Sequence, residues 1–531
     1  MPVRNQQFLI LENKKMKRRE FIKSSIGAGL GLSSINMLAK NVNYNVAENK
    51  KPHIIFIMAD QHRADSLGCM GNKVVISPNI DTLAKEGTVF LSGYSSSPSS
   101  TPARSGLLTG LSPWHHGMLG YGRVAQQYKY EMPMMLRNLG YYTFGIGKMH
   151  WFPQKSLHGF HATLVDESGR AESPDFISDY REWFQLQSPG SDPDLTGIGW
   201  NDHGASVYKL DEKLHPTTWT GQKACELIRN YADEKPLFLK VSFARPHSPY
   251  DPPQRYLDMY RNAEVPEPLI GDWCSDLNEP IDPQKAKTDA PFGNFGVEYV
   301  KNSRKHYYAN ITFIDDMIGN IIQSLKEKGM YDNAIICFTS DHGDMLGDHH
   351  HWRKTYPYEG SAAIPYVVKW PENIVREKNT SFISQPVELR DFLPTFIELA
   401  GGNVPHEMDG MSLLNLVCRK QNEWREFIDI EHATCYVADN YWCALTNGKI
   451  KYVWNFHNGK EQLFDIEKDP GELTECSNNV KYAKTVEKMR KAMIQHLSER
   501  GDSFVKDGQL VVRTSTMLYS PNYPEQNNEK R

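Results

Sequence analysis

Short apolar runs alternate along the chain with segments of helical periodicity. Such runs predict strands that are buried on both faces, and they cover residues 53–58, 141–146, 237–243, 334–338 and 364–368. Spacings of three and four predict one helical stripe formed by Ile311, Ile314, Ile318, Ile321 and Leu325. Pro133 and Gly140 predict the start and end of a second, shorter helix. Buried strands that alternate with amphipathic helices are typical of an α/β layered sheet.

The pattern changes twice along the chain. Nine of the 31 prolines fall in residues 246–291 without a clear period, and we expect this stretch to be an ordered cover over a site. After about residue 415 the pattern predicts shorter strands at 441–445 and 450–454 and a charged helix at 483–500. We therefore expect a main α/β domain over residues 51–415 and a smaller C-terminal α+β subdomain with a tail over residues 416–531.

Composition excludes several classes of protein. The 531 residues include 60 basic and 64 acidic side chains, and 40% are hydrophobic, which is an ordinary globular mixture. The net charge of −4 offers no general attraction for nucleic acid. None of the eight cysteines forms a CxxC pair, so no zinc-finger spacing is present. Whether Cys435 and Cys443 pair across a hairpin stays open.

The N-terminus resembles an export signal. Lys17, Arg18 and Arg19 precede a weakly apolar stretch over residues 26–38 that is too short to span a bilayer as a helix. We interpret residues 1–50 as a targeting segment for the twin-arginine route, with a periplasmic or otherwise exported product and no stable membrane insertion. A disordered basic N-terminus is the alternative interpretation.

Polar side chains follow four of the predicted strands directly. These are Asp60 and Gln61, Asp341 and His342, Lys148 and His150, and His247. Ligands of open α/β sheets bind beyond the carboxyl ends of the strands, so these groups can converge on one crevice. Taken singly, a terminal Asp is more often a helix cap and a lone histidine more often a hydrogen-bonded core residue, but four such positions in one chain favour a shared site.

The sequence Ser100-Thr-Pro-Ala-Arg104-Ser-Gly-Leu-Leu-Thr-Gly110 is the strongest local signal. Pro102 fits a first helical position, which predicts that Ser100 stands just before a helix whose free N–H groups favour an anion. Arg104 adds a positive charge one turn later. An N-capping serine with a surface arginine is the structural alternative.

This string resembles the signature of the sulfatase family, and the resemblance extends over roughly residues 52–475. Further segments are similar to family motifs in the same order: Asp60-Gln61, Gly147-Lys148-Met149-His150, Pro246-His247-Ser248-Pro249, Ser340-Asp341-His342-Gly343 with Lys354 and Tyr358-Glu359, Asp391 to Thr395, and Phe464-Asp465 to Asp469-Pro470. The resemblance implies an alkaline-phosphatase-like fold, a large mixed sheet flanked by helices with a small C-terminal subdomain.

The resemblance also implies a modified nucleophile. In this family the motif residue is oxidised to formylglycine, whose hydrate attacks sulfur with one oxygen and expels sulfate with the other. A plain serine would leave a stable sulfate ester, so the aldehyde splits one hard step into two. Because this chain has Ser100, it resembles the branch matured by anaerobic radical enzymes, and a formylglycine-generating maturation enzyme is an expected partner.

The remaining roles are implied by the same resemblance. Asp60, Gln61, Asp341, His342 and the modified Ser100 would hold one divalent cation, for which Ca²⁺ is our prediction. Lys148 and Lys354 would bind sulfate oxygens, and Arg104 would support the metal and the diol. His150 would be the base for elimination, and His247, with Lys354 beside it, would protonate the leaving oxygen.

Some residues depart from the family pattern or have two interpretations. Gln61 stands where a second carboxylate is common, and His342 where an asparagine is common, although calcium prefers oxygen ligands. Asp344, Asp348 and His349-His350-His351 are predicted to form a solvated loop rather than a second metal site. Trp151, Trp352 and Arg353 could contact a sugar ring or could pack at the rim.

We therefore expect an exported sulfatase that hydrolyses a sulfate monoester, with a sulfated carbohydrate as substrate and activity on small aryl sulfates as a corollary. Two alternatives stay open. One is a phosphonate or phosphate ester hydrolase of the same superfamily. The other is a sulfated-glycan binding protein without catalysis.

Overall fold

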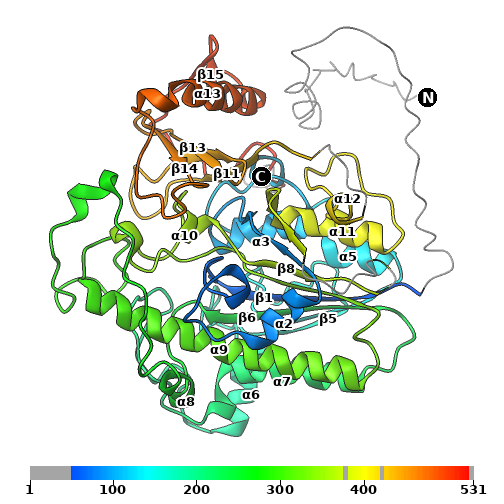
Figure 1. Cartoon of the computed structure of the whole chain (residues 1–531). Helices are drawn as coiled ribbons and strands as arrows, with labels where there is room; N and C mark the ends of the chain where they lie inside the picture. Colours follow the sequence, from blue (N-terminus) through cyan, green and yellow to red (C-terminus); the bar gives the residue numbers. More distant parts are fainter. Residues whose placement is uncertain (1–49, 373, 375–380, 419–423, 525–531) are drawn as a thin grey trace, which may run out of the picture.

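The structure is a computed structural model, and it describes residues 50–372, 374, 381–418 and 424–524 (Figure 1). A large sheet has eight strands in the order β5-β4-β6-β1-β7-β8-β2-β9. The strands are β1 His53–Asp60, β2 Thr88–Phe90, β4 Tyr142–Gly147, β5 Ala162–Val165, β6 Leu237–Pro246, β7 Ala334–Thr339, β8 Tyr366–Lys369 and β9 Ser381–Ile383. β8 runs antiparallel to β7 and β2, so the predicted mixed sheet is confirmed.

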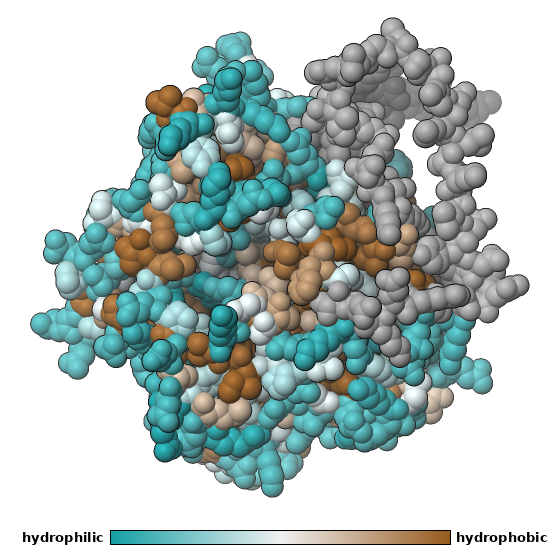
Figure 2. Space-filling model, in the orientation of Figure 1, coloured by the Kyte–Doolittle hydropathy of each residue, from teal (hydrophilic) through white to brown (hydrophobic). Residues whose placement is uncertain are grey.

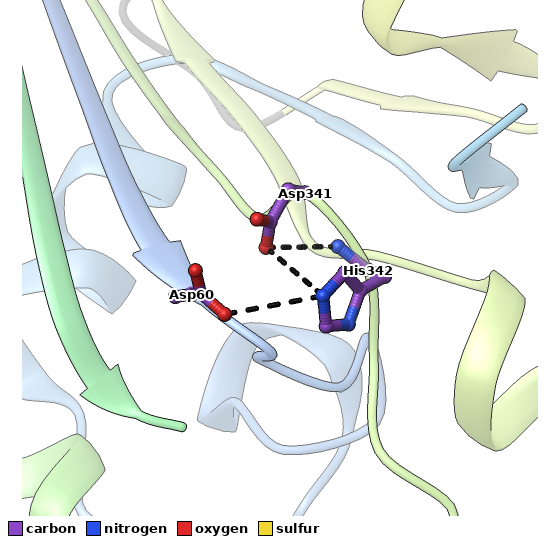
Figure 3. Close-up of side chains that lie close together, drawn as sticks. All are labelled: Asp60, Asp341 and His342. Carbon is purple, nitrogen blue, oxygen red and sulfur yellow. Dashed lines mark hydrogen bonds and ion pairs between the residues drawn. The ribbon is translucent and has the colours of Figure 1, made fainter. Parts of the chain in front are cut away.

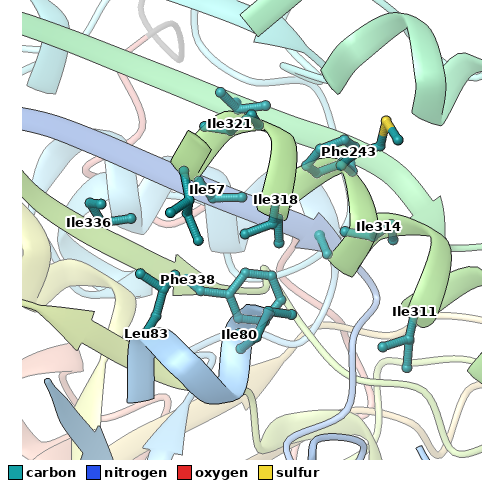
Figure 4. Close-up of a cluster of buried hydrophobic side chains, with 14 of the residues drawn as sticks. Ile57, Ile80, Leu83, Phe243, Ile311, Ile314, Ile318, Ile321, Ile336 and Phe338 are labelled. Carbon is teal, nitrogen blue, oxygen red and sulfur yellow. The ribbon is translucent and has the colours of Figure 1, made fainter. Parts of the chain in front are cut away.

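The central strands are apolar because helices cover both faces of the sheet. All eight residues of β1 are buried, and it pairs in parallel with β6 and β7. One face carries α2 Pro78–Lys85, α7 Pro216–Asn230 and α9 Val297–Glu327, and the other carries α3 Ser100–Thr109, α5 Met132–Asn138, α11 Phe392–Leu399 and α12 Leu414–Val417 (Figure 1). The predicted isoleucine stripe of α9 packs onto this core beside Ile57 and Phe338 (Figure 4).

The C-terminal part forms a second, smaller sheet. Four antiparallel strands follow one another in order, and α13 Ala483–Leu497 packs on them through Met489 and Met493. They are β11 Ile428–His432, β12 Trp442–Thr446, β13 Ile450–Asn455 and β14 Glu461–Asp465. This confirms the predicted smaller subdomain: β12 and β13 lie within one residue of the two predicted strands, and α13 begins at the predicted residue and ends three residues before the predicted end, whereas β11 and β14 were not predicted.

Shorter elements complete the described fold. The helices are α4 Pro113–His116, α6 Asp179–Gln187, α8 Gln254–Asp258 and α10 Glu359–Ala362, and the strand pairs are β3 Gly93–Tyr94 with β10 Val387–Glu388 and β15 Val505–Lys506 with β16 Gln509–Leu510. Residues 246–291 contain α8 and a 3₁₀ turn over Asp272–Leu277. Within that stretch Leu269 donates its backbone N–H to Asp348 at 2.8 Å, so it packs on the segment that leads to Lys354.

Three further points concern the surface of the molecule, the cysteines and the predicted targeting segment. The face in Figure 2 is mostly hydrophilic with scattered apolar patches, and no helix among the described residues is long and apolar enough to cross a membrane. All eight cysteines lie within the described ranges and none of them forms a disulfide, so Cys435 and Cys443 are not bridged. The targeting segment lies almost entirely outside the described residues and stays a prediction.

Candidate active site

The ends of β1 and β7 bring two carboxylates and an imidazole together. Asp60 is the last residue of β1, and Asp341 and His342 follow β7, its parallel neighbour (Figure 3). One ligand atom from each of the three lies within 4.8 Å of the others, and all three residues have 0% exposure. Residues more than 280 positions apart therefore form a compact group of cation ligands; we refer to Asp60, Asp341 and His342 as the acidic group.

The hydrogen bonds of the acidic group leave ligand atoms available for a cation. His342 Nδ1 contacts the carbonyl oxygen of Gly343 at 2.9 Å and must donate there, so Nε2 is the acceptor nitrogen. That nitrogen lies 3.9 Å from Asp60 Oδ1 and 3.8 Å from Asp341 Oδ1. Asp60 Oδ1 is buried and has no hydrogen-bond partner among the described residues. A buried carboxylate oxygen without a donor is expected where an ion binds.

Two buried cations neutralise the carboxylates. The Arg104 guanidinium donates to Asp60 Oδ2 at 2.9 Å and to Asp341 Oδ2 at 2.8 Å. Lys148 Nζ lies 2.9 Å from Asp60 Oδ2. Burial alone would raise the pKa of Asp60, but the positive charges of Lys148 and Arg104 outweigh it and hold that pKa well below its usual value. Asp60 is therefore ionised, as a metal ligand must be.

Ser100 lies against this group at the start of α3. Its Oγ is 3.0 Å from His342 Nε2, and the residue is 1% exposed. The helix begins at Ser100 itself, with Ser99 as the N-cap, so the prediction that Pro102 opens it was wrong. Pro102 is the third helical residue, where its missing N–H still costs no intrahelical hydrogen bond. Arg104 is fully buried rather than a surface arginine.

Gln61, Lys354 and His247 form a chain beside the acidic group. Lys354 Nζ donates to Gln61 Oε1 at 2.8 Å and contacts His247 Nε2 at 2.7 Å. His247 Nδ1 contacts the carbonyl of Ser248 at 2.9 Å, which makes Nε2 the acceptor for Lys354. The Gln61 amide nitrogen donates to Asp344. The side chain of Gln61 is thus engaged by Lys354 and Asp344, while its backbone N–H donates to Asp341 Oδ1 at 3.1 Å.

Burial controls the protonation of this chain. Burial, together with the charges of Lys354 and Lys148, holds the pKa of His247 well below its usual value, so its imidazole is neutral. Burial also lowers the pKa of Lys354 to about 8, against the attraction of Asp60. An ammonium with a pKa near neutrality is a usable proton donor.

His150 lies at the edge of the site. Its Nε2 is 3.5 Å from the Tyr121 hydroxyl, and its backbone N–H donates to Glu167 at 2.9 Å. Among the described residues it makes no hydrogen bond to Ser100. Burial and the charges of Arg170, Lys148 and Arg104 hold its pKa well below the usual value, so it is a neutral base.

The expectation of a solvated loop before Lys354 was wrong, and of the two interpretations left open for Trp151 and Trp352, the packing one agrees with their burial. Asp348 and His349 are 3% and 2% exposed rather than solvated, and Asp348 pairs with Arg63 at 2.8 Å and with Arg304. Trp151 and Trp352 are 2% and 0% exposed, so neither indole can stack on a sugar. Trp352 instead packs on His203 at 4.5 Å between ring centroids.

Sequence reasoning did not identify Trp200, Asp344 or Tyr121 as part of the site. Trp200 stacks on His247 with 5.8 Å between ring centroids, and Asp344 accepts from Tyr250 at 2.6 Å beside Gln61. Asp344 was available as a signal because it follows Asp341 by three residues. Trp200 and Tyr121 lie in segments without periodicity, and no local pattern marks them.

Comparison with known proteins decides the family. The family model described as Sulfatase matches residues 52–402, and one described as N-sulphoglucosamine sulphohydrolase, C-terminal, matches residues 347–499. The chain belongs to the sulfatase family. This sulfatase is therefore an enzyme that hydrolyses sulfate esters, and the predicted family, fold and activity are confirmed.

Relatives of this sulfatase span nearly its whole length. It is 36% identical over 474 residues to an arylsulfatase of Clostridium perfringens, covering 87% of this chain and 97% of the relative. It is 32% identical to a choline-sulfatase of Rhizobium meliloti, covering 81% of this chain and 83% of the relative. A phosphonate monoester hydrolase of Agrobacterium radiobacter shares the fold, with a TM-score of 0.70 at 22% identity over 87% of this chain and 99% of that one.

Proposed function

We propose that this sulfatase acts at Ser100, after its oxidation to formylglycine, beside a Ca²⁺ ion held by the acidic group. The observation that carries the proposal is the contact of 3.0 Å between Ser100 Oγ and His342 Nε2, next to the partnerless Oδ1 of Asp60. It puts the residue of the family signature within reach of a group of ligands that could hold a cation and so activate its hydroxyl.

The donor set fits one divalent cation. Asp60 and Asp341 supply carboxylate oxygens, which suit calcium, and His342 supplies a nitrogen that calcium accepts less readily. Gln61 could add its amide oxygen only by giving up the hydrogen bond from Lys354. When bound, the cation would act as a Lewis acid on the sulfate and would lower the pKa of the nucleophilic hydroxyl.

The fixed charges favour a sulfate ester once that cation is present. The two carboxylates are balanced by Arg104 and Lys148, so the cation adds a net positive charge to a buried, water-poor site. Lys148 and Lys354 can then donate to sulfate oxygens, since each has an ammonium facing the acidic group. Preorganised donors of this kind stabilise charge that spreads over oxygens in the transition state.

We assign proton transfer to two histidines near the acidic group, His247 and His150. His247 is neutral and accepts a hydrogen bond from the Lys354 ammonium on Nε2, so Lys354 is the proton source of this pair and His247 positions it to protonate the leaving oxygen. His150 is a neutral base with a buried Nδ1 that lacks a partner among the described residues, and we assign it the proton of the nucleophilic hydroxyl during elimination.

The substrate we propose is a sulfated carbohydrate. Support comes from relatives named N-acetylglucosamine-6-O-sulfatase (27% identical, Bacteroides thetaiotaomicron) and Ulvan-active sulfatase (26% identical, Formosa agariphila). A structural neighbour, BT4656, was solved with D-glucosamine-2-N,6-O-disulfate at a TM-score of 0.67 and 21% identity. The export signal and a maturation enzyme for Ser100 belong to the same proposal.

The first test weighs the Ser100 peptide of protein purified from its natural producer. Conversion to formylglycine makes the peptide lighter by two hydrogen atoms. Ser100→Ala is expected to abolish sulfate release from aryl and sugar sulfates while the folded state survives. Ser105→Ala is the matched control, because Ser105 lies on the same buried helix and its side-chain hydrogen bonds within the described part of the chain are to Thr101, Thr109, Met118 and Tyr128, outside the acidic group.

The same experiment separates the alternatives. An unmodified Ser100 together with turnover of phosphate or phosphonate esters would favour the phosphoester hydrolase. An unmodified Ser100 with binding but no turnover would favour a glycan-binding protein. Full sulfate release by Ser100→Ala would reject the assigned nucleophile.

A further inference from the structure

Trp200 contacts two proposed catalytic groups at once. Its ring lies nearly parallel to the His247 imidazole, at 16° and 5.8 Å between centroids, and Lys148 Nζ is 5.9 Å from its centre. His247 and Lys148 are each 1% exposed, whereas Trp200 is only partly buried. The indole therefore separates the buried pair from solvent on this side of the site.

A tight turn presents this indole. Gly199 donates its N–H to Asp202 Oδ2 at 2.8 Å, and Asp202 donates its own to the carbonyl of Gly199 at 3.0 Å, with Trp200 at the corner between them. The Ser248 hydroxyl also bonds the carbonyl of Gly199 at 3.0 Å. Because Ser248 directly follows His247, one short segment positions both the imidazole and the ring stacked on it.

The turn is braced on its other side as well. Thr288 donates its hydroxyl to Asp202 Oδ1 at 2.9 Å, and the backbone N–H of His203 donates to the carbonyl of Thr288 at 3.0 Å. These contacts fix the backbone of the turn on both sides of Trp200, and the stacking on His247 orients the indole before any ligand binds. Preorganised aromatic surface of this kind binds flat ligand faces at low entropic cost.

We propose that Trp200 binds the leaving group of the sulfate ester and selects substrates whose leaving group is a flat-faced ring. The inference rests on the proposed function, in which the leaving oxygen meets His247. A ring joined to that oxygen directly, as in an aryl sulfate, or through one methylene, as in a 6-O-sulfate, would lie alongside the imidazole and therefore alongside the indole stacked on it. The C–H face of a sugar or the face of an aryl ring would pack there, while the sulfate contacts only the charged groups.

The experiment compares ring-bearing ligands with inorganic sulfate, which fills the sulfate subsite without a leaving group. Trp200→Ala is expected to raise KM for 4-nitrophenyl sulfate and for glucosamine 6-sulfate about tenfold, and Trp200→Phe is expected to restore most of this loss. The inhibition constant of inorganic sulfate is expected to stay unchanged, because sulfate carries no leaving group that could pack on the indole. Trp183→Ala, at a partly exposed tryptophan of α6 that packs on Tyr180, is the matched control and should alter neither constant.

Two results would overturn the inference. Unchanged KM for both ring substrates would show that the indole does not touch the leaving group. An equal loss of affinity for inorganic sulfate would show that Trp200 only supports the histidine and lysine beneath it. If Ser100 proved unmodified and turnover were absent, calorimetric binding of glucosamine 6-sulfate against inorganic sulfate would still measure the contribution of Trp200, so the two proposals fail separately.

Discussion

Arg104 offers the sharpest test of how the acidic group is held together. The guanidinium has no exposed side-chain surface and makes four hydrogen bonds, to Asp60, Asp341, the carbonyl of Lys148 and the hydroxyl of Ser242. Arg104→Met keeps the length of the side chain and removes the charge. Two carboxylates then remain buried without the group that bridges them.

The expected loss of stability depends on the partners that Asp60 and Asp341 keep after the substitution. Breaking a buried ion pair costs about 3–5 kcal/mol when it leaves an uncompensated charge. Asp60 keeps Lys148 at 2.9 Å, so its loss is partial. Asp341 loses its only arginine or lysine partner within 4 Å among the described residues and keeps the backbone N–H groups of Gln61 and His342. We therefore expect a loss of about 3 kcal/mol in the free energy of unfolding, at the lower end of that range.

Denaturant unfolding in the presence of a chelator measures this loss without a contribution from bound metal. Adding Asp341→Asn to Arg104→Met is expected to recover roughly 2 kcal/mol, since a neutral amide does not need the cation. Arg104→Lys is expected to behave like the methionine variant, because one ammonium cannot reproduce the fork that spans both carboxylates. A loss below about 1 kcal/mol, or a double variant no more stable than the single one, would refute the reasoning.

Three further outcomes are expected. Ca²⁺ should raise the melting temperature of the wild type, and Asp60→Asn should abolish that rise in a thermal-shift assay; an equal rise in both would place the ion elsewhere. His247→Ala should slow sugar sulfates far more than activated aryl sulfates, and equal losses of kcat/KM would remove its role in protonating the leaving oxygen. Burial would lower the pKa of His115, but Asp409 and Glu499 raise it to about 9. The charged His115 therefore stabilises the folded state fully below about pH 6.5, and this contribution is lost as the pH rises through about 9. The side chain is 30% exposed, so solvent screening reduces the effect. His115→Gln should lower the free energy of unfolding by about 1 kcal/mol at pH 6 and leave it unchanged near pH 10, as measured by the denaturant midpoint.

Hydrophobic pattern alone was sufficient for the central sheet. The predicted run at 53–58 is β1, and those at 237–243 and 334–338 are its two neighbours, because a strand covered on both faces has to be apolar throughout. The apolar stripe from Ile311 to Leu325 predicted only the second half of α9. Its first half carries buried polar residues such as Arg304, which donates to the carbonyl of Leu346 at 3.0 Å, and such contacts leave no periodic apolar signal.

The site could be predicted as a set of residues but not as an arrangement. Strand ends identified Asp60 and Asp341, whose meeting follows from the parallel pairing of β1 and β7. The orientation of Gln61 depends on Lys354 and Asp344, more than 280 positions away, and no local pattern encodes it. Trp200 is part of the site through a turn held by Ser248, a contact across 49 positions that the sequence does not show.

The separation between Ser100 and His342 has a consequence for synthesis of the protein. The two residues stand 242 positions apart, so the helix that bears the serine leaves the ribosome well before the strand that completes its enclosure. At about 5–20 residues per second, translation leaves an interval of roughly 12–48 s in which His342 has not yet been synthesised and cannot cover the hydroxyl of Ser100. An enzyme that oxidises Ser100 can reach the side chain during that interval, whereas in the folded protein the residue is only 1% exposed.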